Sequence, residues 1–121
     1  MNNKKILICD DEMGIRESLK LILENDFELI LVEDGLQCID CLENASENIG
    51  LILMDIKMPK FNGLEILEKI KEKWPEQKII IITGYRSVET ATEAVRLGAS
   101  GYIVKPFKSE EILSSVRSAM K

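Results

Sequence analysis

Charged and hydroxyl side chains directly follow four of the apolar segments of this 121-residue sequence. The residues at these positions are Asp10-Asp11-Glu12, Asp55, Thr83-Gly84 and Lys105-Pro106. Carboxylate oxygens are hard ligands that suit Mg²⁺ better than zinc, and Mg²⁺ keeps several of its waters. A carboxylate can also attack a phosphoryl group while a metal ion and a cation neutralise the phosphoryl oxygens. Brought together, these residues would support phosphoryl transfer to Asp55, with Lys105 as the cation and Thr83 as a hydrogen-bond donor.

The acidic pair Asp10-Asp11 has a simpler explanation, which is that it caps the first helix. Capping accounts for one acidic residue, but not for two that follow a buried strand and face Asp55. Two unit charges about 4 Å apart repel by roughly 4 kcal/mol at an effective dielectric constant of 20. A metal ion, a proton or a lysine in the gap relieves that repulsion. We therefore predict a Mg²⁺ site on Asp10, Asp11 and Asp55, in which Mn²⁺ could substitute.

Short continuous apolar runs predict the strands that position these residues. Four-residue runs at 6–9, 51–54 and 79–82 are typical of strands buried on both faces of a parallel sheet covered by helices. Two weaker strands are predicted at 27–32 and 101–104. Because the carboxyl ends of parallel strands meet at one edge of the sheet, the chemically active residues would gather there.

Apolar residues spaced three and four apart predict a helix after each strand. These stripes are Ile15, Leu19 and Ile22; Leu36, Ile39 and Leu42; Leu64, Leu67, Ile70 and Trp74; Val88, Ala91 and Val95; and Ile112, Val116 and Ala119. Candidate helix caps are Asp34 with Gln37, Asn62 with Glu65, Ser87 and Ser109 at the starts, and Asn25 and Gly98 at the ends. Right-handed crossovers between the strands then require a doubly wound five-stranded parallel sheet with helices on both faces. We predict one α/β domain over residues 1–121.

The composition argues against two classes of partner. The net charge is −5 and no block of Lys or Arg occurs, so nothing in the charge favours binding to nucleic acid. No apolar run approaches the roughly 20 residues of a membrane span. The apolar residues that follow the opening Met-Asn-Asn-Lys-Lys are too few for a signal peptide. We expect a cytoplasmic protein without a membrane segment.

The spacing Cys38-x-x-Cys41 can mark redox or metal chemistry. Here it lies within a predicted helix rather than at its start, and the chain has no histidine and no second cysteine pair. We interpret both cysteines as small, partly buried hydrophobic residues that the cytosol keeps reduced.

From about Lys4 to Met120, the order and spacing of these motifs resemble the response-regulator receiver domain of two-component signalling. The resemblance is carried by the acidic pair, by Asp55-Ile-Lys-Met-Pro-Lys-Phe-Asn-Gly63, by Thr83-Gly84 and by Gly101-Tyr-Ile-Val-Lys-Pro-Phe107. It implies a flavodoxin-like fold with five helices and strand order 2-1-3-4-5. It also implies a phosphoacceptor switch in transcription regulation rather than an enzyme that turns over external substrates.

The resemblance implies a role for each site residue. Asp55 would be the phosphoacceptor, Asp11 a direct Mg²⁺ ligand, and Asp10 a ligand largely through metal-bound water. The main-chain carbonyl of Lys57 would complete the protein ligands. Lys105 would contact the phosphoryl group and precede a cis peptide bond, which is accessible mainly before proline.

The resemblance also implies that Thr83 and Tyr102 form a switch pair. On phosphorylation the threonine hydroxyl would move toward the new oxygens, and the tyrosine ring would fill the vacated space. The population would shift toward an arrangement read at the fourth helix, fifth strand and fifth helix. Lys57 and Tyr85 stand where side chains influence access of water to the phosphoryl group.

The phosphoryl donor must come from another protein, because the chain contains no histidine. The resemblance implies a histidine kinase or phosphotransfer protein, with Gly14, Ile15 and Leu19 as its docking face, although Leu19 fits the core better. A homodimer could form through the fourth helix, fifth strand and fifth helix. Gly84-Tyr85, together with residues 87–99, further resembles NtrC-type receivers of sigma-54-dependent activators.

Three other functions are compatible with parts of this pattern. A haloacid-dehalogenase-like phosphatase also uses an Asp nucleophile and Mg²⁺. Its nucleophile lies in an Asp-x-Asp motif after the first strand, whereas this chain has Asp10-Asp11-Glu12 there. A flavodoxin-like nucleotide or flavin binder needs a loop there that cradles phosphate, which Asp10-Asp11-Glu12 would repel. A receiver that acts only as a protein-binding module would not need the complete acidic and basic set.

Overall fold

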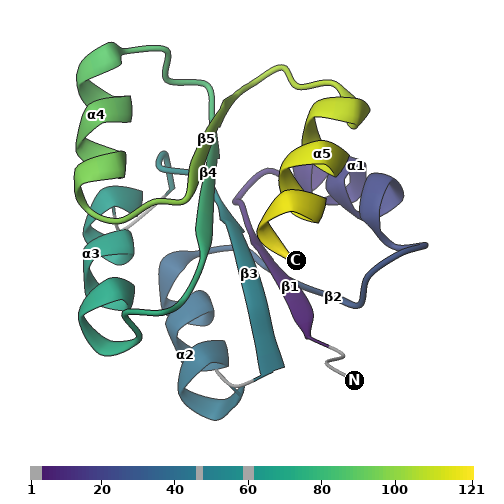
Figure 1. Cartoon of the computed structure of the whole chain (residues 1–121), viewed down its shortest axis with the longest axis horizontal. Helices are drawn as coiled ribbons and strands as arrows, with labels where there is room; N and C mark the ends of the chain where they lie inside the picture. The colour runs from purple at the N-terminus through teal and green to yellow at the C-terminus, as the bar shows by residue number, and fades with distance from the viewer. Residues whose placement is uncertain (1–3, 46–47, 59–61) are drawn as a thin grey trace.

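A five-stranded parallel sheet lies between two layers of helices in the computed structural model, which describes residues 4–45, 48–58 and 62–121 (Figure 1). The strands are β1 (Lys5–Cys9), β2 (Leu29–Val32), β3 (Ile49–Met54), β4 (Ile79–Thr83) and β5 (Gly101–Val104). Their order is β2-β1-β3-β4-β5 and every pair is parallel. The predicted fold class and strand order are confirmed.

Two hydrophobic clusters hold the helices against the two faces of the sheet. The helices are α1 (Met13–Leu23), α2 (Gly35–Ala45), α3 (Gly63–Lys73), α4 (Val88–Arg96) and α5 (Ser109–Ala119). Figure 1 shows α1 and α5 on one face and α2, α3 and α4 on the other. Alternate residues of β1 divide between the clusters, with Leu7 in one and Ile6 in the other. Both faces of the central strands are therefore buried, as continuous apolar runs predict.

Helix caps confirm most of the predicted boundaries. The Asn62 side chain accepts a hydrogen bond from Leu64 N at 2.9 Å, and Ser87 Oγ accepts hydrogen bonds from two amides of α4. Asp34 Oδ1 likewise accepts from the amide three residues later at 2.9 Å. Gly98 adopts φ = +106°, the left-handed conformation that ends many helices. The prediction for Ser109 was wrong, because Ser109 is already helical and the extended residue before it makes no side-chain cap.

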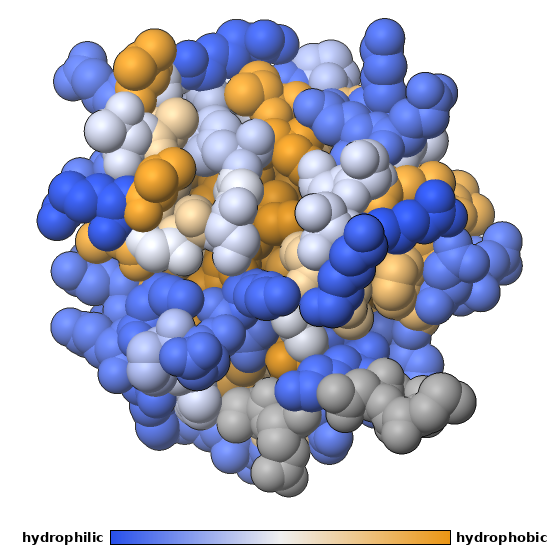
Figure 2. Space-filling model, in the orientation of Figure 1, coloured by the Kyte–Doolittle hydropathy of each residue, from blue (hydrophilic) through white to orange (hydrophobic). Residues whose placement is uncertain are grey.

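The apolar stripe predicted for α4 is not the face that this helix buries. Val88 and Val95 are 79% and 61% exposed, whereas Ala94 is fully buried. The small side chain of Ala94 faces the sheet, so the valines are left outside. Figure 2 shows apolar side chains reaching the surface on the α4 side of the molecule among hydrophilic ones. Leu36 is also 48% exposed, because α2 packs through Cys38 and Leu42.

The cysteines behave as buried hydrophobic residues. Cys38 is fully buried, Cys41 is partly buried, and both are free thiols. Burial raises the pKa of Cys41, which keeps the thiol protonated and unreactive. Among the described residues, no helix has the length and apolar character needed to cross a bilayer.

Candidate functional site

Asp10 and Asp55 stand side by side at the carboxyl ends of β1 and β3. The strands pair Cys9 with Met54, and the Asp55 amide donates to the Cys9 carbonyl at 3.1 Å. Both aspartates are almost completely buried, with 2% and 4% of their surface exposed. In each, Oδ1 accepts a hydrogen bond from the amide two residues later, from Glu12 at 2.9 Å and from Lys57 at 3.0 Å. These turns fix both carboxylates and direct Oδ2 away from the backbone.

The Lys105 ammonium binds both of these Oδ2 atoms. Nζ lies 2.9 Å from Asp10 Oδ2 and 2.8 Å from Asp55 Oδ2, and a third carboxylate, that of Glu12, lies 3.2 Å away. Lys105 follows β5, and its amide donates to the Thr83 carbonyl at the end of β4. Its side chain therefore reaches across the carboxyl ends of the central strands. The peptide bond to Pro106 is cis, as the resemblance to receiver domains implies.

The charges of this cluster do not balance. Burial raises the pKa of Asp10, and the hydrogen bonds from Lys105 and the Glu12 amide only partly oppose that rise. Burial alone would lower the pKa of Lys105, but hydrogen bonds to Asp55 and Asp10 outweigh it and raise the pKa well above the usual value. Lys105 therefore stays cationic. Among the described residues, Lys105 is the cation that forms ion pairs with this cluster, whose four acidic side chains are those of Asp10, Asp11, Glu12 and Asp55. The Arg16 guanidinium lies nearby and donates to the Asp10 carbonyl at 2.8 Å.

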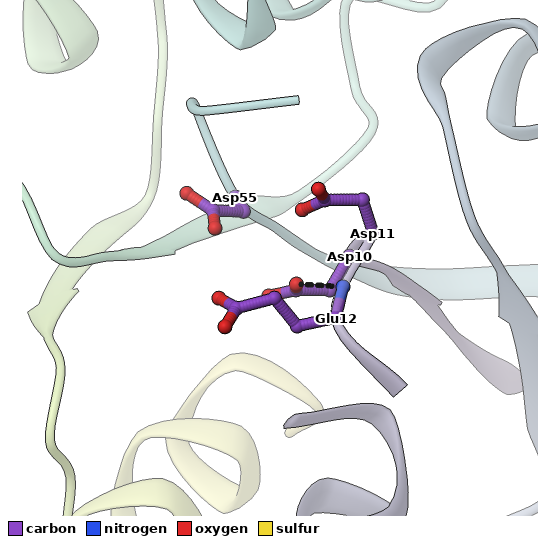
Figure 3. Close-up of side chains that lie close together, drawn as sticks. All are labelled: Asp10, Asp11, Glu12 and Asp55. Atoms are coloured by element: carbon purple, nitrogen blue, oxygen red, sulfur yellow. Dashed lines mark hydrogen bonds between the residues drawn. The ribbon is translucent and has the colours of Figure 1, made fainter. Parts of the chain in front are cut away.

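The acidic side chains fit a divalent cation by geometry and by donor type. Asp10, Asp11, Glu12 and Asp55 each offer an oxygen, and these oxygens all lie within 4.8 Å of one another. Figure 3 shows the four side chains at the same edge of the sheet, Asp55 from one strand and the others from the segment after β1. Mg²⁺ takes oxygens at 2.0–2.1 Å, so opposite ligands of its octahedron are about 4 Å apart. Small side-chain movements would close the cluster on Mg²⁺.

A small cavity opens beside Asp55 and is bounded by the loop between β4 and α4. Its volume is about 270 Å³, and it is lined by Glu12, Asp55, Lys57, Thr83, Gly84, Tyr85 and Lys105. Since a water occupies about 30 Å³ in the liquid, this space can hold a phosphoryl group together with several waters. Thr83 is fully buried, and its Oγ1 is 3.5 Å from the Tyr85 amide.

Two side-chain hydrogen bonds join this loop to β5 and its end. The Tyr102 hydroxyl donates to the Tyr85 carbonyl at 2.9 Å, and the Arg86 guanidinium donates to the Lys105 carbonyl at 3.2 Å. Burial and the charge of Asp55 raise the pKa of Tyr102, so its hydroxyl remains a donor. The loop that bounds the cavity is thus held through Tyr102, one of the two predicted switch residues.

Gly63 allows α3 to begin close to the phosphoacceptor candidate. A Cβ at this position would lie 2.5 Å from Ile56 Cα and 2.6 Å from the Asp55 carbonyl oxygen, which are backbone atoms that cannot move aside easily. The Gly63 amide also donates to the Ile56 carbonyl at 2.8 Å. The lack of a side chain at position 63 therefore lets the start of α3 pack directly against the backbone of Asp55 and Ile56.

The structure gathers most of the predicted site residues and adds one. Asp10, Asp11, Asp55, Thr83 and Lys105 meet at the predicted edge, whereas the Pro-Lys-Phe part of the motif, residues 59–61, lies outside the described residues. Glu12 is the residue that sequence reasoning left without a role, although it continues the acidic run. On the predicted docking face, Gly14 is exposed, Ile15 is partly exposed and Leu19 is buried.

Comparisons with known proteins agree with this fold and identify the family. The family model of the response regulator receiver domain matches residues 6–117, and the chain belongs to this family. The transcriptional regulatory protein YdfI of Bacillus subtilis is 35% identical over 120 residues, which cover 97% of this chain and 55% of YdfI. The chain spans about half the length of the curated relatives it matches.

Solved receiver structures superpose on nearly the whole chain. A CheY-like receiver domain protein from Methanospirillum hungatei is 36% identical with a TM-score of 0.89, covering 97% of this chain and 93% of that chain. A chain of the CheX-CheY-BeF₃-Mg complex from Borrelia burgdorferi is 28% identical with a TM-score of 0.92, covering 98% of this chain and 90% of that chain. Membership of this family sets aside the phosphatase and flavin-binding alternatives.

Proposed function

We propose that the chain accepts a phosphoryl group on Asp55 from a phosphohistidine of a sensor kinase or phosphotransfer protein. The observation that carries this proposal is the position of Asp55 Oδ2, which lies 2.8 Å from the Lys105 ammonium. Asp55 also borders a cavity of about 270 Å³ and belongs to the acidic cluster. The Borrelia complex supports the proposal, because it contains BeF₃ and Mg²⁺ together with CheX and CheY.

In the transfer, an Asp55 carboxylate oxygen forms a bond to phosphorus while the phosphorus–nitrogen bond of the donor imidazole breaks. The electron pair of that bond stays on the imidazole nitrogen, which takes a proton from solvent. Asp10, Asp11, Asp55 and the Lys57 carbonyl would hold Mg²⁺, which neutralises the negative charge of the phosphoryl oxygens. Lys105 is already within hydrogen-bond distance of Asp55 and would bind one of the new oxygens.

The signal would leave the site through the loop between β4 and α4. Thr83 lines the cavity, and Tyr102 holds the same loop through the Tyr85 carbonyl. Movement of the Thr83 hydroxyl toward a phosphoryl oxygen would shift the population toward a second arrangement of this loop and of α4, β5 and α5. This shift would be the output of the domain, which assists its own phosphorylation and dephosphorylation and turns over no external substrate.

The partners follow from the same proposal. The kinase or phosphotransfer protein would dock beside the exposed Gly14 and partly exposed Ile15, while a homodimer would use α4, β5 and α5. The similarity to a transcriptional regulatory protein supports a cytoplasmic role in gene regulation. A receiver of the NtrC type stays a prediction from the resemblance of Gly84-Tyr85 and residues 87–99.

Phosphorylation can be tested with acetyl phosphate and Mg²⁺, with the intact protein mass as the readout. We expect a single phosphoryl adduct in the wild type and none in Asp55→Asn or in the presence of EDTA. Asp26→Asn serves as a matched control, since Asp26 is exposed and lies outside the acidic cluster. A wild type that gains no adduct would leave a protein-binding module as the better description.

A further inference from the structure

Glu12 is the third carboxylate in contact with Lys105, and it differs from the other two in exposure. Its side chain is 62% exposed, whereas those of Asp10 and Asp55 are 3% and 4% exposed. Its Oε1 is 3.2 Å from Lys105 Nζ. The buried pair holds the ammonium in place, and Glu12 covers it from the solvent side.

The position of Glu12 in α1 leaves its side chain available for this contact. Glu12 is the N-cap residue of α1, with φ −90° and ψ 117°, but its side chain makes no capping hydrogen bond. The Glu12 amide is bound by Asp10 Oδ1, and its carbonyl accepts from Arg16 at 3.1 Å. Its backbone therefore serves the turn and the helix, while its carboxylate lines the cavity with Asp55 and Lys105.

A group attached to Asp55 enters the cavity that Glu12 borders. We propose that Glu12 is a positioning residue that competes with the phosphoryl oxygens for the Lys105 ammonium, so that it weakens the anion site of the phosphorylated domain. This inference rests on the proposed function, because it concerns the same anion. Glu12 holds Lys105 when Asp55 is free, and it repels a phosphoryl group when Asp55 is modified. It thereby favours the unphosphorylated state.

Three variants separate contact with Lys105 from a general effect of charge. Glu12→Gln keeps the shape of the side chain and removes its charge. Glu12→Asp keeps the charge but is one methylene shorter, which withdraws the carboxylate from Lys105. Glu17→Gln changes the net charge by the same amount as Glu12→Gln, but at an exposed position of α1 outside the acidic cluster and the cavity.

The assay measures the affinity of beryllium fluoride, a phosphoryl analogue, at a Mg²⁺ concentration that saturates each variant. Amide resonances of Thr83 and Lys105 report binding. We expect Glu12→Gln and Glu12→Asp to bind beryllium fluoride about two- to fivefold more tightly, the effect of an exposed ion pair, while Glu17→Gln matches the wild type. Melting temperatures in EDTA serve as the control for stability. If they are equal in the wild type and the variants, a purely structural role of Glu12 cannot explain tighter binding of beryllium fluoride.

The inference is overturned if Glu12→Gln binds no more tightly than the wild type. It is also overturned if Glu12→Asp behaves as the wild type while Glu12→Gln binds more tightly. The negative charge at position 12 would then explain the effect without any contact with Lys105. Failure of the proposed function looks different. In that case the wild type binds no beryllium fluoride and gains no adduct from acetyl phosphate.

Discussion

Neutralising Asp11 should stabilise the metal-free protein and remove most of its response to Mg²⁺. The Asp11 carboxylate lies within 4.8 Å of three other carboxylates and is itself exposed to solvent. At this distance each repulsion is about 0.9 kcal/mol in water, with a dielectric constant of 80. The Lys105 ammonium offsets part of the summed repulsion between Asp11 and the three other carboxylates. We therefore expect Asp11→Asn to raise the free energy of unfolding by about 1–2 kcal/mol in EDTA at low ionic strength.

Mg²⁺ should reverse this order of stability. A ligand present at a hundred times its Kd stabilises the native state by about 2.7 kcal/mol, a gain that the wild type receives and Asp11→Asn largely loses. Thermal unfolding in EDTA and in increasing Mg²⁺ measures both effects, and one kcal/mol corresponds to a shift in Tm of about 3–5 °C for a domain of this size. Glu17→Gln should follow the wild type. The account of a crowded acidic cluster is refuted if Asp11→Asn is less stable than the wild type in EDTA and still gains stability from Mg²⁺.

Three further substitutions test the geometry of the site. Lys105→Ala should lower the free energy of unfolding in EDTA by about 2–4 kcal/mol, because two buried carboxylates lose their cation; unchanged urea denaturation would contradict this. Tyr102→Phe removes the hydrogen bond to the Tyr85 carbonyl, so it should cost about 0.5–1.5 kcal/mol and speed amide exchange in the loop after β4; unaltered exchange there would count against the link. Gly63→Ala should cost about 1–3 kcal/mol and slow phosphorylation of Asp55, since the added methyl group meets backbone atoms; a wild-type phosphorylation rate would show that the loop adapts.

The sheet could be predicted from the sequence because its central strands are buried on both faces. The runs at 6–9, 51–54 and 79–82 leave no polar face for solvent, and the observed strands contain all three. The helices were predicted from their period, but the buried face of α4 was not. Ala94 and the valines share a helix, and which of them faces the sheet depends on how the helix is placed over β4 and β5. Local periodicity contains no information on that placement.

The candidate site could likewise be predicted only in part from the sequence. Asp10 and Asp55 follow buried central strands and Lys105 follows the partly buried edge strand β5, so the parallel topology alone predicts that they meet. The role suggested for Glu12 depends on a contact between residues 93 positions apart and on a side chain that leaves its helix uncapped. The hydrogen bond from Tyr102 to the Tyr85 carbonyl likewise depends on the path of a loop. Only the three-dimensional structure supplies these contacts.

The most direct test of the central claim is to locate the phosphoryl group on a single residue. After reaction with acetyl phosphate and Mg²⁺, borohydride reduces an aspartyl phosphate to homoserine, and peptide mass spectrometry finds the position. We predict homoserine at residue 55 alone, with none in Asp55→Asn or in EDTA. Homoserine at Asp10 or Asp11 instead, or none in the wild type, would contradict the account.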